Sequence, residues 1–223
     1  MQLAIINGSP RYKKSNSQLL TEHFLTGYNT FSTDKVTIAY LANKKSREKA
    51  LEAFQRVDTV ILIFPLYTDC MPGIVKEFIE SLARTDHESI KKIGFIVQSG
   101  FPEAIHSVAV ERYLEKLAGR LKCECLGTVI KGGVEGIQEM PPWMTKKLFR
   151  QFRELGNYFA KHQSFSPTLV KAFRKPYKFS PVGRFFIQMM NLTGLGNVHW
   201  NSELKKNGAF EDRFARPYAV EYR

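Results

Sequence analysis

The sequence predicts an α/β protein with a doubly wound parallel β-sheet, covered by helices on both faces. Short apolar segments alternate with amphipathic ones throughout residues 1–162. The first apolar segment, residues 3–6, is an unbroken run, which is typical of a strand buried on both faces. Glycine and proline follow several of these segments, as expected of loops. Strands that alternate with helices in this way form parallel sheets.

Five strands are predicted, with helices between them. The strands span residues 3–7, 35–40, 57–64, 93–98 and 125–131. Apolar residues recur at helical spacing in residues 74–82 and 110–121, and another helix is expected from Pro142 to His162. Pro141 and Pro142 favour its start, since proline suits a first helical turn. Ligands of such sheets bind at the carboxyl ends of strands, so the loops after the first, third and fourth strands are the expected site.

Residues 163–223 do not continue the alternation. They are rich in aromatic residues and contain ten Lys and Arg against four Asp and Glu, which is about half of the net positive charge. A basic segment with many aromatic residues could bind an anionic membrane surface or single-stranded nucleic acid. Pro176 and Pro181 interrupt any long amphipathic helix, which favours packing against protein. We therefore predict a domain at residues 1–162 and an extension at residues 163–223 that packs on this domain or on a partner subunit.

The composition is that of a soluble globular protein. Hydrophobic residues make up 43% of the 223 residues, and charged residues make up 24%. The net charge of +12, from 33 Lys and Arg against 21 Asp and Glu, is spread along the chain. This spread favours a soluble surface with a site for an anionic cofactor, and we expect no nucleic-acid partner.

Several features favour a cytoplasmic location. No apolar run approaches the ~20 residues of a membrane-spanning helix, so no stable membrane insertion is expected. The first residues are typical of a strand and a loop rather than of a signal peptide. Cys70, Cys123 and Cys125 are too few for a disulfide framework. Cys123 and Cys125 lie on one side of a strand with no further ligand nearby, so we expect them to pack in the core and predict no metal site.

Polar residues gather between the first strand and a helix that we expect to begin near Gln18. Gly8 and Pro10 end the strand. Hydroxyl and amide groups follow in Ser9, Ser15, Asn16 and Ser17, with positive charge on Arg11, Lys13 and Lys14. Such a turn directs backbone N–H groups and a helix N-terminus at one point, where a phosphate is stabilised. An ordinary N-cap is the alternative, since Ser and Asn favour it, but the position after a buried strand favours phosphate binding.

The other two expected loops contain groups suited to a planar ligand. After the third strand come Pro65, Leu66, Tyr67 and Thr68, and Tyr67 can cover a flat ring. After the fourth strand come Ser99 and Gly100, and Gly100 allows the backbone to approach a ligand closely. Both loops are expected at the same edge of the sheet as the first loop.

Together the three loops resemble those of the flavodoxin-like NAD(P)H-dependent FMN reductases and their quinone-reductase and azoreductase relatives. The resemblance covers roughly residues 1–162. It is carried by Gly8-Ser9-Pro10-Arg11 with Ser15-Asn16-Ser17, by Pro65-Leu66-Tyr67 with Met71-Pro72-Gly73, and by Ser99-Gly100. It implies a five-stranded sheet in the order 2-1-3-4-5 and a bound FMN. By position, it assigns the phosphate to Ser9, Arg11, Ser15, Asn16 and Ser17, the flavin ring to Pro65, Leu66, Tyr67 and Thr68, and the polar edge of the ring to Ser99 and Gly100.

The resemblance implies an oxidoreductase that passes electrons from NAD(P)H through FMN to a small acceptor such as a flavin, a quinone, or an azo or nitro compound. The partners would be a nicotinamide nucleotide, the acceptor and a second copy in a homodimer. No catalytic side chain is assigned, because the flavin itself carries the redox chemistry. Two alternatives remain open at this point. One is a flavodoxin-type electron carrier without NAD(P)H turnover, and the other is a non-enzymatic flavin-binding module.

Overall fold

A computed structural model describes residues 2–83 and 91–216 of the chain. The chain divides into two compact units, Met1–Lys178 and Phe179–Arg223.

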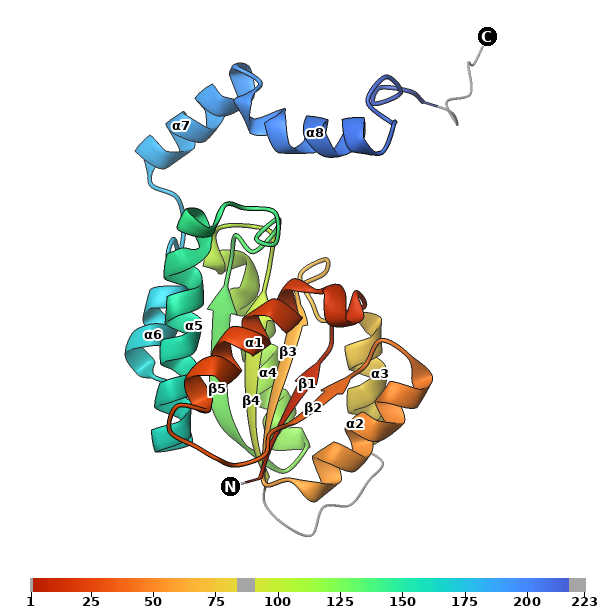
Figure 1. Ribbon diagram of the computed structural model, residues 1–223, viewed down its shortest axis with the longest axis vertical. Helices are drawn as coiled ribbons and strands as arrows, with labels where there is room; N and C mark the ends of the chain where they lie inside the picture. Colours follow the sequence, from red (N-terminus) through yellow and green to blue (C-terminus); the bar gives the residue numbers. More distant parts are fainter. Residues whose placement is uncertain (1, 84–90, 217–223) are drawn as a thin grey trace. The chain divides into compact units, whose positions relative to one another are not determined.

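The first unit is built on a five-stranded parallel sheet (Figure 1). The strands are β1 (Leu3–Asn7), β2 (Thr37–Tyr40), β3 (Thr59–Pro65), β4 (Lys91–Gln98) and β5 (Cys123–Lys131). Their order is β2-β1-β3-β4-β5, which confirms the predicted topology. The strand order reverses at β1 and β3, where Ile5 is paired with Ile38 on one side and with Ile61 on the other. In doubly wound sheets a crevice opens at this reversal, beyond the carboxyl ends of the strands.

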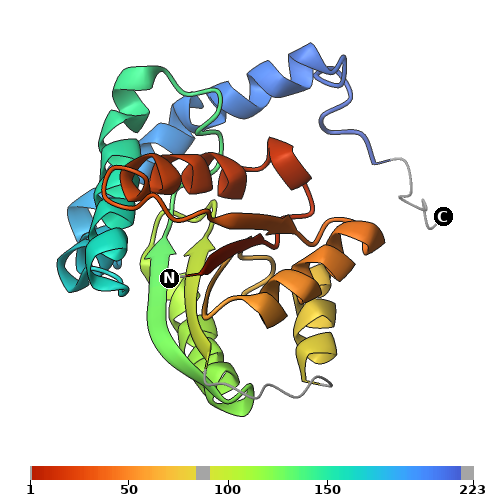
Figure 2. The ribbon, with the colours of Figure 1, turned by 60° about the horizontal axis from the view of Figure 1, so that its bottom comes forward.

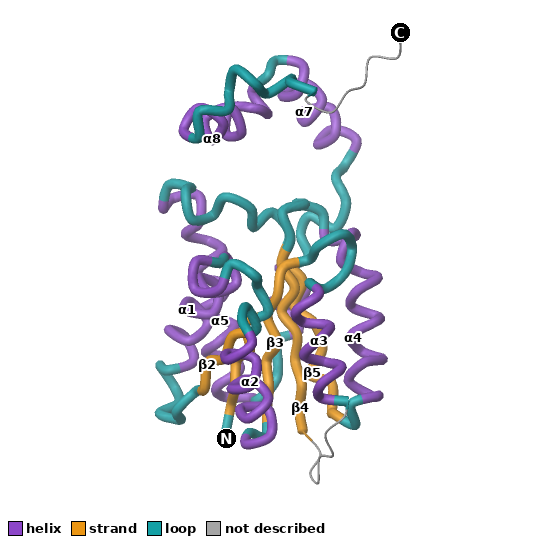
Figure 3. The backbone as a smooth tube through the Cα atoms, turned by 90° about the vertical axis from the view of Figure 1, so that its right-hand side faces the viewer, coloured by secondary structure: helices purple, strands orange, loops and turns teal. Residues whose placement is uncertain are grey.

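Helices cover both faces of the sheet, as Figures 2 and 3 show. The cluster of buried residues on one face joins the sheet to α1 (Asn16–Tyr28), α5 (Pro142–His162) and α6 (Pro167–Phe173). The cluster on the other face joins it to α2 (Lys44–Arg56), α3 (Gly73–Leu82) and α4 (Val108–Arg120). Cys123 is buried in the second cluster and Cys125 packs against it, as predicted. Burial on both faces explains the unbroken apolar runs of β1 and β3.

The α1 and α5 helices approach each other closely at two glycines. A Cβ atom placed on Gly27 would overlap the carbonyl oxygen of Arg153. A Cβ atom placed on Gly156 would overlap the carbonyl oxygen of Phe24. Only hydrogen atoms fit at these two positions, so the two glycines set the distance between the helices.

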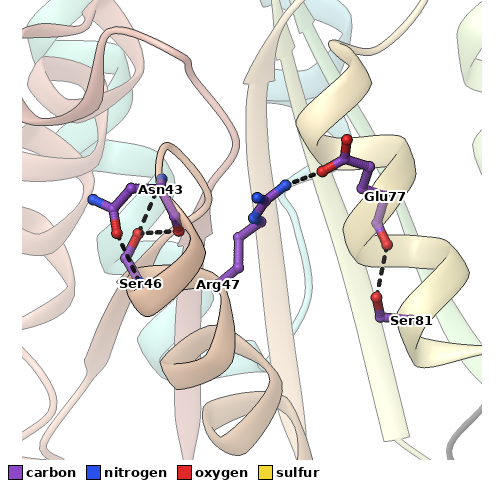
Figure 4. A network of polar contacts seen from close by, with 5 residues as sticks. All are labelled: Asn43, Ser46, Arg47, Glu77 and Ser81. Carbon is purple, nitrogen blue, oxygen red and sulfur yellow. Dashed lines mark hydrogen bonds and ion pairs between the residues drawn. The ribbon is translucent and has the colours of Figure 1, made fainter.

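On the opposite face, polar contacts connect α2 to α3 (Figure 4). Asn43 caps α2, because its Oδ1 accepts a hydrogen bond of 2.9 Å from the backbone N–H of Ser46. One turn further on, the Arg47 guanidinium pairs with the Glu77 carboxylate of α3. The Ser81 hydroxyl donates to the Glu77 carbonyl oxygen at 2.9 Å. These contacts run between α2 and α3, the helix that follows the loop after β3.

The first unit continues through residues 163–178, beyond the boundary expected at residue 162. Phe165 and Phe173 are buried against α5 and the sheet. Gly94 of β4 makes room for this packing, since a Cβ atom there would lie 2.7 Å from the Phe165 ring. The Pro176 and Tyr177 carbonyl oxygens then accept hydrogen bonds from the backbone N–H groups of Ala104 (3.0 Å) and Ile105 (3.1 Å).

The second unit contains α7 (Pro181–Leu192), a 3₁₀ turn (Leu195–Asn197) and α8 (Val198–Lys206). Ser180 caps α7, with its hydroxyl oxygen 3.1 Å from the backbone nitrogen of Gly183. None of the twelve residues of α7, all of which are described, is buried. Within the described part of the chain, no helix is both long enough and apolar enough to cross a bilayer.

Candidate functional site

The loops after β1, β3 and β4 meet at the carboxyl edge of the sheet and line one cavity, as expected from the topology. The cavity contains about 420 Å³ of empty space, including space open to solvent. Its lining residues are Ser9, Arg11, Asn16, Pro65, Leu66, Tyr67, Gln98, Ser99, Gly100 and Glu135. Eight of the eleven predicted site residues are among them. The other three do not line the cavity: Ser15 and Thr68 lie in the same loops, and Ser17 lies in the first turn of α1.

The first loop is shaped by Asn7, the buried last residue of β1. Its Oδ1 accepts a hydrogen bond of 2.9 Å from the backbone N–H of Ser9, and its Nδ2 donates to Ser15 Oγ at 3.3 Å. The Ser15 hydroxyl also donates to the Tyr12 carbonyl oxygen at 2.7 Å and accepts from the Gln18 backbone N–H at 3.1 Å. Ser15 is therefore the N-cap of α1, which begins at Asn16, two residues before the expected start.

The start of α1 offers hydrogen-bond donors to a ligand. The first N–H groups of any helix lack partners within the helix and carry partial positive charge. Ser17 is completely buried, and its hydroxyl has no hydrogen-bond partner in the described residues. Buried hydroxyl groups are rarely left unpaired, and an anion bound at the start of α1 would give this one a partner. The exposed Arg11 side chain adds a full positive charge at the cavity.

Asn16 connects the first loop to the loop after β5. Its Nδ2 donates to the Val134 carbonyl oxygen at 2.8 Å, and its Oδ1 accepts from Gln138 Nε2 at 2.7 Å. Gln138 Nε2 also lies 3.2 Å from the Lys14 carbonyl oxygen. The side chain of Asn16 thus holds two loops of the cavity together.

The second loop presents an aromatic ring to the cavity. The Leu66 N–H donates to the Gln98 carbonyl oxygen at 2.7 Å, which fixes the loop to β4. Tyr67 and Cys70 then exchange two backbone hydrogen bonds of 2.8 and 3.0 Å. The two residues between them, Thr68 and Asp69, have φ angles of 46° and 62°, in the left-handed region that closes a tight turn. The Tyr67 side chain at the base of this turn is 47% exposed and available for stacking.

The third loop contributes backbone groups. The Ser99 N–H donates to the Lys131 carbonyl oxygen at 3.0 Å, and the Ser99 carbonyl oxygen accepts from the Val134 N–H at 2.9 Å. The Ser99 hydroxyl donates to the Phe101 carbonyl oxygen at 3.1 Å. Gly100 lies beside Glu135, such that a Cβ atom on Gly100 would be 3.4 Å from the Glu135 Cβ.

Gln98 and Glu135 are lining residues that the sequence reasoning missed. Gln98 is the last residue of the predicted strand 93–98, and the final side chain of a strand reaches the edge where ligands bind. Glu135 follows β5, and the predicted site includes only the loops after the first, third and fourth strands. The signal was present in the glycine-rich residues 132–136. Two segments of the backbone approach each other closely here, since a Cβ atom on Gly132 would lie 2.6 Å from the Pro102 carbonyl oxygen.

Charge near the cavity is mixed. Arg11 and Glu135 both line it. At the end of β5, burial lowers the pKa of the Lys131 ammonium group, and the positive charge of Lys147 lowers it further. In the described residues, no cluster of His, Cys, Asp and Glu side chains is arranged to hold a metal ion.

A family model for the flavodoxin-like fold matches residues 1–147 of this chain. The match covers more than half of the 223 residues, so the chain belongs to this flavodoxin-like family. No curated protein sequence matches it.

Solved structures share the fold at low sequence identity. An FMN-dependent NADH-azoreductase from Bacillus anthracis str. Ames Ancestor, in complex with FMN, has a TM-score of 0.54 and 16% identity, with 72% of this chain and 100% of that chain covered. An NAD(P)H:quinone oxidoreductase from Methanothermobacter marburgensis has a TM-score of 0.54 and 14% identity, with 73% and 98% covered. The Trp repressor binding protein from Bacillus subtilis has a TM-score of 0.54 and 20% identity, with 72% and 99% covered.

Proposed function

We propose that this protein is an FMN-dependent oxidoreductase that passes electrons from NAD(P)H to a small acceptor, such as a flavin, a quinone, or an azo or nitro compound. The observation that carries the proposal is the meeting of three loops in one cavity, with a helix start at the first loop and an exposed tyrosine at the second. The solved structures with this fold also support an FMN-dependent oxidoreductase, since they include an NADH-azoreductase in complex with FMN and an NAD(P)H:quinone oxidoreductase.

The donor groups of the cavity suit FMN. Arg11, the unpaired Ser17 hydroxyl and the first N–H groups of α1 would hold the phosphate. Ser9 and Asn16, which lie in the same loop, would complete this end of the site. Ser15 would contribute through its backbone and as the N-cap, because its hydroxyl already has partners within the chain.

The other two loops would hold the flavin ring. Pro65 and Leu66 would line it, Thr68 would support the turn beside it, and the Tyr67 ring would cover one face. Ser99 and Gly100 would lie at its polar edge, where Gly100 would offer its backbone and Ser99, whose N–H is bonded to Lys131, would hold the loop in place. Bound FMN supplies the redox chemistry, namely hydride acceptance from the nicotinamide and electron transfer to the acceptor. The chain would position the ring with one face open, so donor and acceptor would bind in turn.

Ligand binding to Arg11→Gln and Ser17→Ala variants tests the phosphate assignment. Each variant removes a donor to a charged group, so each should weaken FMN binding by roughly 10- to 100-fold. Riboflavin lacks the phosphate, so its affinity should be unchanged in both variants. Arg56→Gln is a matched control, because Arg56 is the exposed last residue of α2 and pairs with Glu52. Equal losses for FMN and riboflavin would contradict the assignment.

Turnover separates the enzyme from its alternatives. The reconstituted protein should oxidise NADH or NADPH in the presence of quinone, azo and flavin acceptors, with parallel double-reciprocal plots. An electron carrier would bind FMN but would not oxidise the nicotinamide. A binding module would not reduce any acceptor. A protein that does not bind FMN at all would refute the proposal.

A further inference from the structure

The loop after β4 is supported by two different segments of the chain. Ser99 and Gly100 of this loop line the cavity, so its conformation shapes the candidate site. Residues 131–134 hold its first part, where the Gly133 N–H donates to the Phe101 carbonyl oxygen at 3.0 Å in addition to the two backbone bonds of Ser99. These bonds reach as far as Phe101, and a second segment bonds to the residues that follow.

The second segment consists of residues 174–177, which we call the strap. The Ala104 N–H donates to the Pro176 carbonyl oxygen at 3.0 Å, and the Ile105 N–H donates to the Tyr177 carbonyl oxygen at 3.1 Å. Ala104 begins the 3₁₀ turn that leads into α4. Both bonds use only main-chain atoms, so they require only that the strap stays in position.

A buried ring and an ion pair fix the start of the strap. Phe173, directly before the strap, is buried, and its ring centre lies 4.8 Å from that of Phe152 in α5. The Arg174 guanidinium pairs with the Glu111 carboxylate of α4. The two side chains are only 31% and 24% exposed. Water and salt screen such a shielded pair less than an exposed one, so removal of one partner costs more.

The strap therefore contacts the chain on both sides of the start of α4. Its backbone bonds lie at residues 104–105, before the helix, and its ion pair lies at Glu111, within the first turns. Residues 131–134 and the strap together fix the loop after β4 at both of its ends. A loop that is already ordered avoids the entropic cost of becoming ordered when its ligand binds. Arg174 does not line the cavity, so it would act only through this loop.

We propose that the strap positions the loop after β4 for the flavin ring, and that this positioning depends on Arg174. The proposal rests on the proposed function for the identity of the ligand. The family model matches residues 1–147, so the strap lies outside the matched part of the chain. This chain thus supports a loop of the candidate site with a segment that the family model does not include.

Hydrogen exchange of the full-length protein without ligand tests whether the strap holds the loop. In Arg174→Gln, the Ala104 and Ile105 amides should exchange roughly 10-fold faster, because the strap that accepts their hydrogen bonds is released. The amides of the central strand β3 should exchange at the rate of the natural protein, since their opening reports on global unfolding.

Three further variants serve as controls for this measurement. Glu111→Gln removes the other partner of the pair, so it should accelerate the same amides, and its combination with Arg174→Gln should add little. Arg174→Lys keeps the positive charge and should restore part of the protection. Arg150→Gln is the matched control, because Arg150 forms an exposed pair with Glu154 within α5 and should leave the loop unchanged.

Flavin binding tests whether the loop serves the ring. Arg174→Gln should weaken the binding of FMN and of riboflavin by the same factor, roughly 10-fold, because both ligands contain the ring that the loop would meet. Arg11→Gln should weaken FMN binding alone, so variants of the strap and variants of the phosphate end have different signatures.

Each result decides part of the proposal. Unchanged exchange at Ala104 and Ile105 in Arg174→Gln would overturn it. An equal acceleration in β3 would also overturn it, because Arg174 would then contribute only to global stability. Faster local exchange with unchanged affinity for both flavins would overturn the link between the strap and the ring. If the natural protein binds neither flavin, the proposed function fails, whereas the exchange data still decide whether the strap holds the loop.

Discussion

The close approach of α1 and α5 can be tested by replacing Gly156 with alanine. The added Cβ atom would overlap the Phe24 carbonyl oxygen and would lie 2.9 Å from the Tyr28 backbone nitrogen. These atoms belong to the backbone, so they cannot rotate away and the helices must separate. Overpacking costs ~1–3 kcal/mol, and a contact with rigid atoms belongs at the upper end. Alanine regains ~1 kcal/mol of helix propensity, so the free energy of unfolding should fall by about 2 kcal/mol.

Gly119→Ala is the matched control for this change. Gly119 lies in α4, and a Cβ atom placed there meets nothing within 4 Å. The same substitution should therefore raise the free energy of unfolding by ~0.5–1 kcal/mol, through helix propensity and a less flexible unfolded chain. Urea unfolding followed by circular dichroism measures both values. If Gly156→Ala is as stable as the natural protein, the helices are not held at the described distance and the reasoning is refuted.

Three further predictions concern charged and titratable groups. Burial, with Arg153 nearby, lowers the pKa of His23 below 6.5, so protonation opposes folding and stability falls as the pH drops through this range. The deficit in melting temperature of His23→Gln relative to the natural protein should therefore shrink from pH 7 to pH 5. Burial, and then the charge of Lys147, lowers the pKa of Lys131 from 10.5, so the charged form of Lys131 destabilises the fold, and Lys131→Met should raise the melting temperature at pH 7. This gain should fade as the pH approaches 10.5, where the ammonium group loses its proton in the unfolded chain as well. A gain that does not change with pH would contradict this cause. Glu77→Gln should change the free energy of unfolding, measured by urea denaturation, by less than ~1 kcal/mol, because the Glu77 carboxylate that pairs with Arg47 is mostly exposed. A larger loss would mean that this pair holds α3 in place.

The sheet could be predicted from the sequence because burial on both faces leaves a strong pattern. Residues 3–6 and 60–64 are unbroken apolar runs, and each lies in a strand in which every residue is buried. The α2 helix left a weaker signal, since only Ala50, Ala53 and Phe54 of its thirteen residues are buried. Helices at the margin of a sheet are mostly polar, so few apolar residues mark their buried face.

The end of the first unit could not be predicted because it depends on contacts distant in the sequence. Phe165 packs over Gly94, and residues 176–177 bond to residues 104–105. Nothing in the local pattern of residues 163–178 distinguishes a segment that packs on the sheet from one that leaves it. Eight of the eleven residues predicted for the site line one cavity, because in a parallel sheet the loop after each strand must emerge at the same edge.

The shape of the candidate site arises from a backbone arrangement that the sequence does not display. At the end of each of three strands, a following residue donates its N–H to a carbonyl oxygen of the next strand in the sheet. Gly8 bonds to Ile63 at 2.8 Å, Leu66 to Gln98 at 2.7 Å, and Ser99 to Lys131 at 3.0 Å. These bonds use only main-chain atoms, so they persist when side chains change. Variants of Arg11 or Tyr67 should therefore alter what the cavity binds while leaving its loops in place, which is why ligand specificity and fold can be tested separately in this protein.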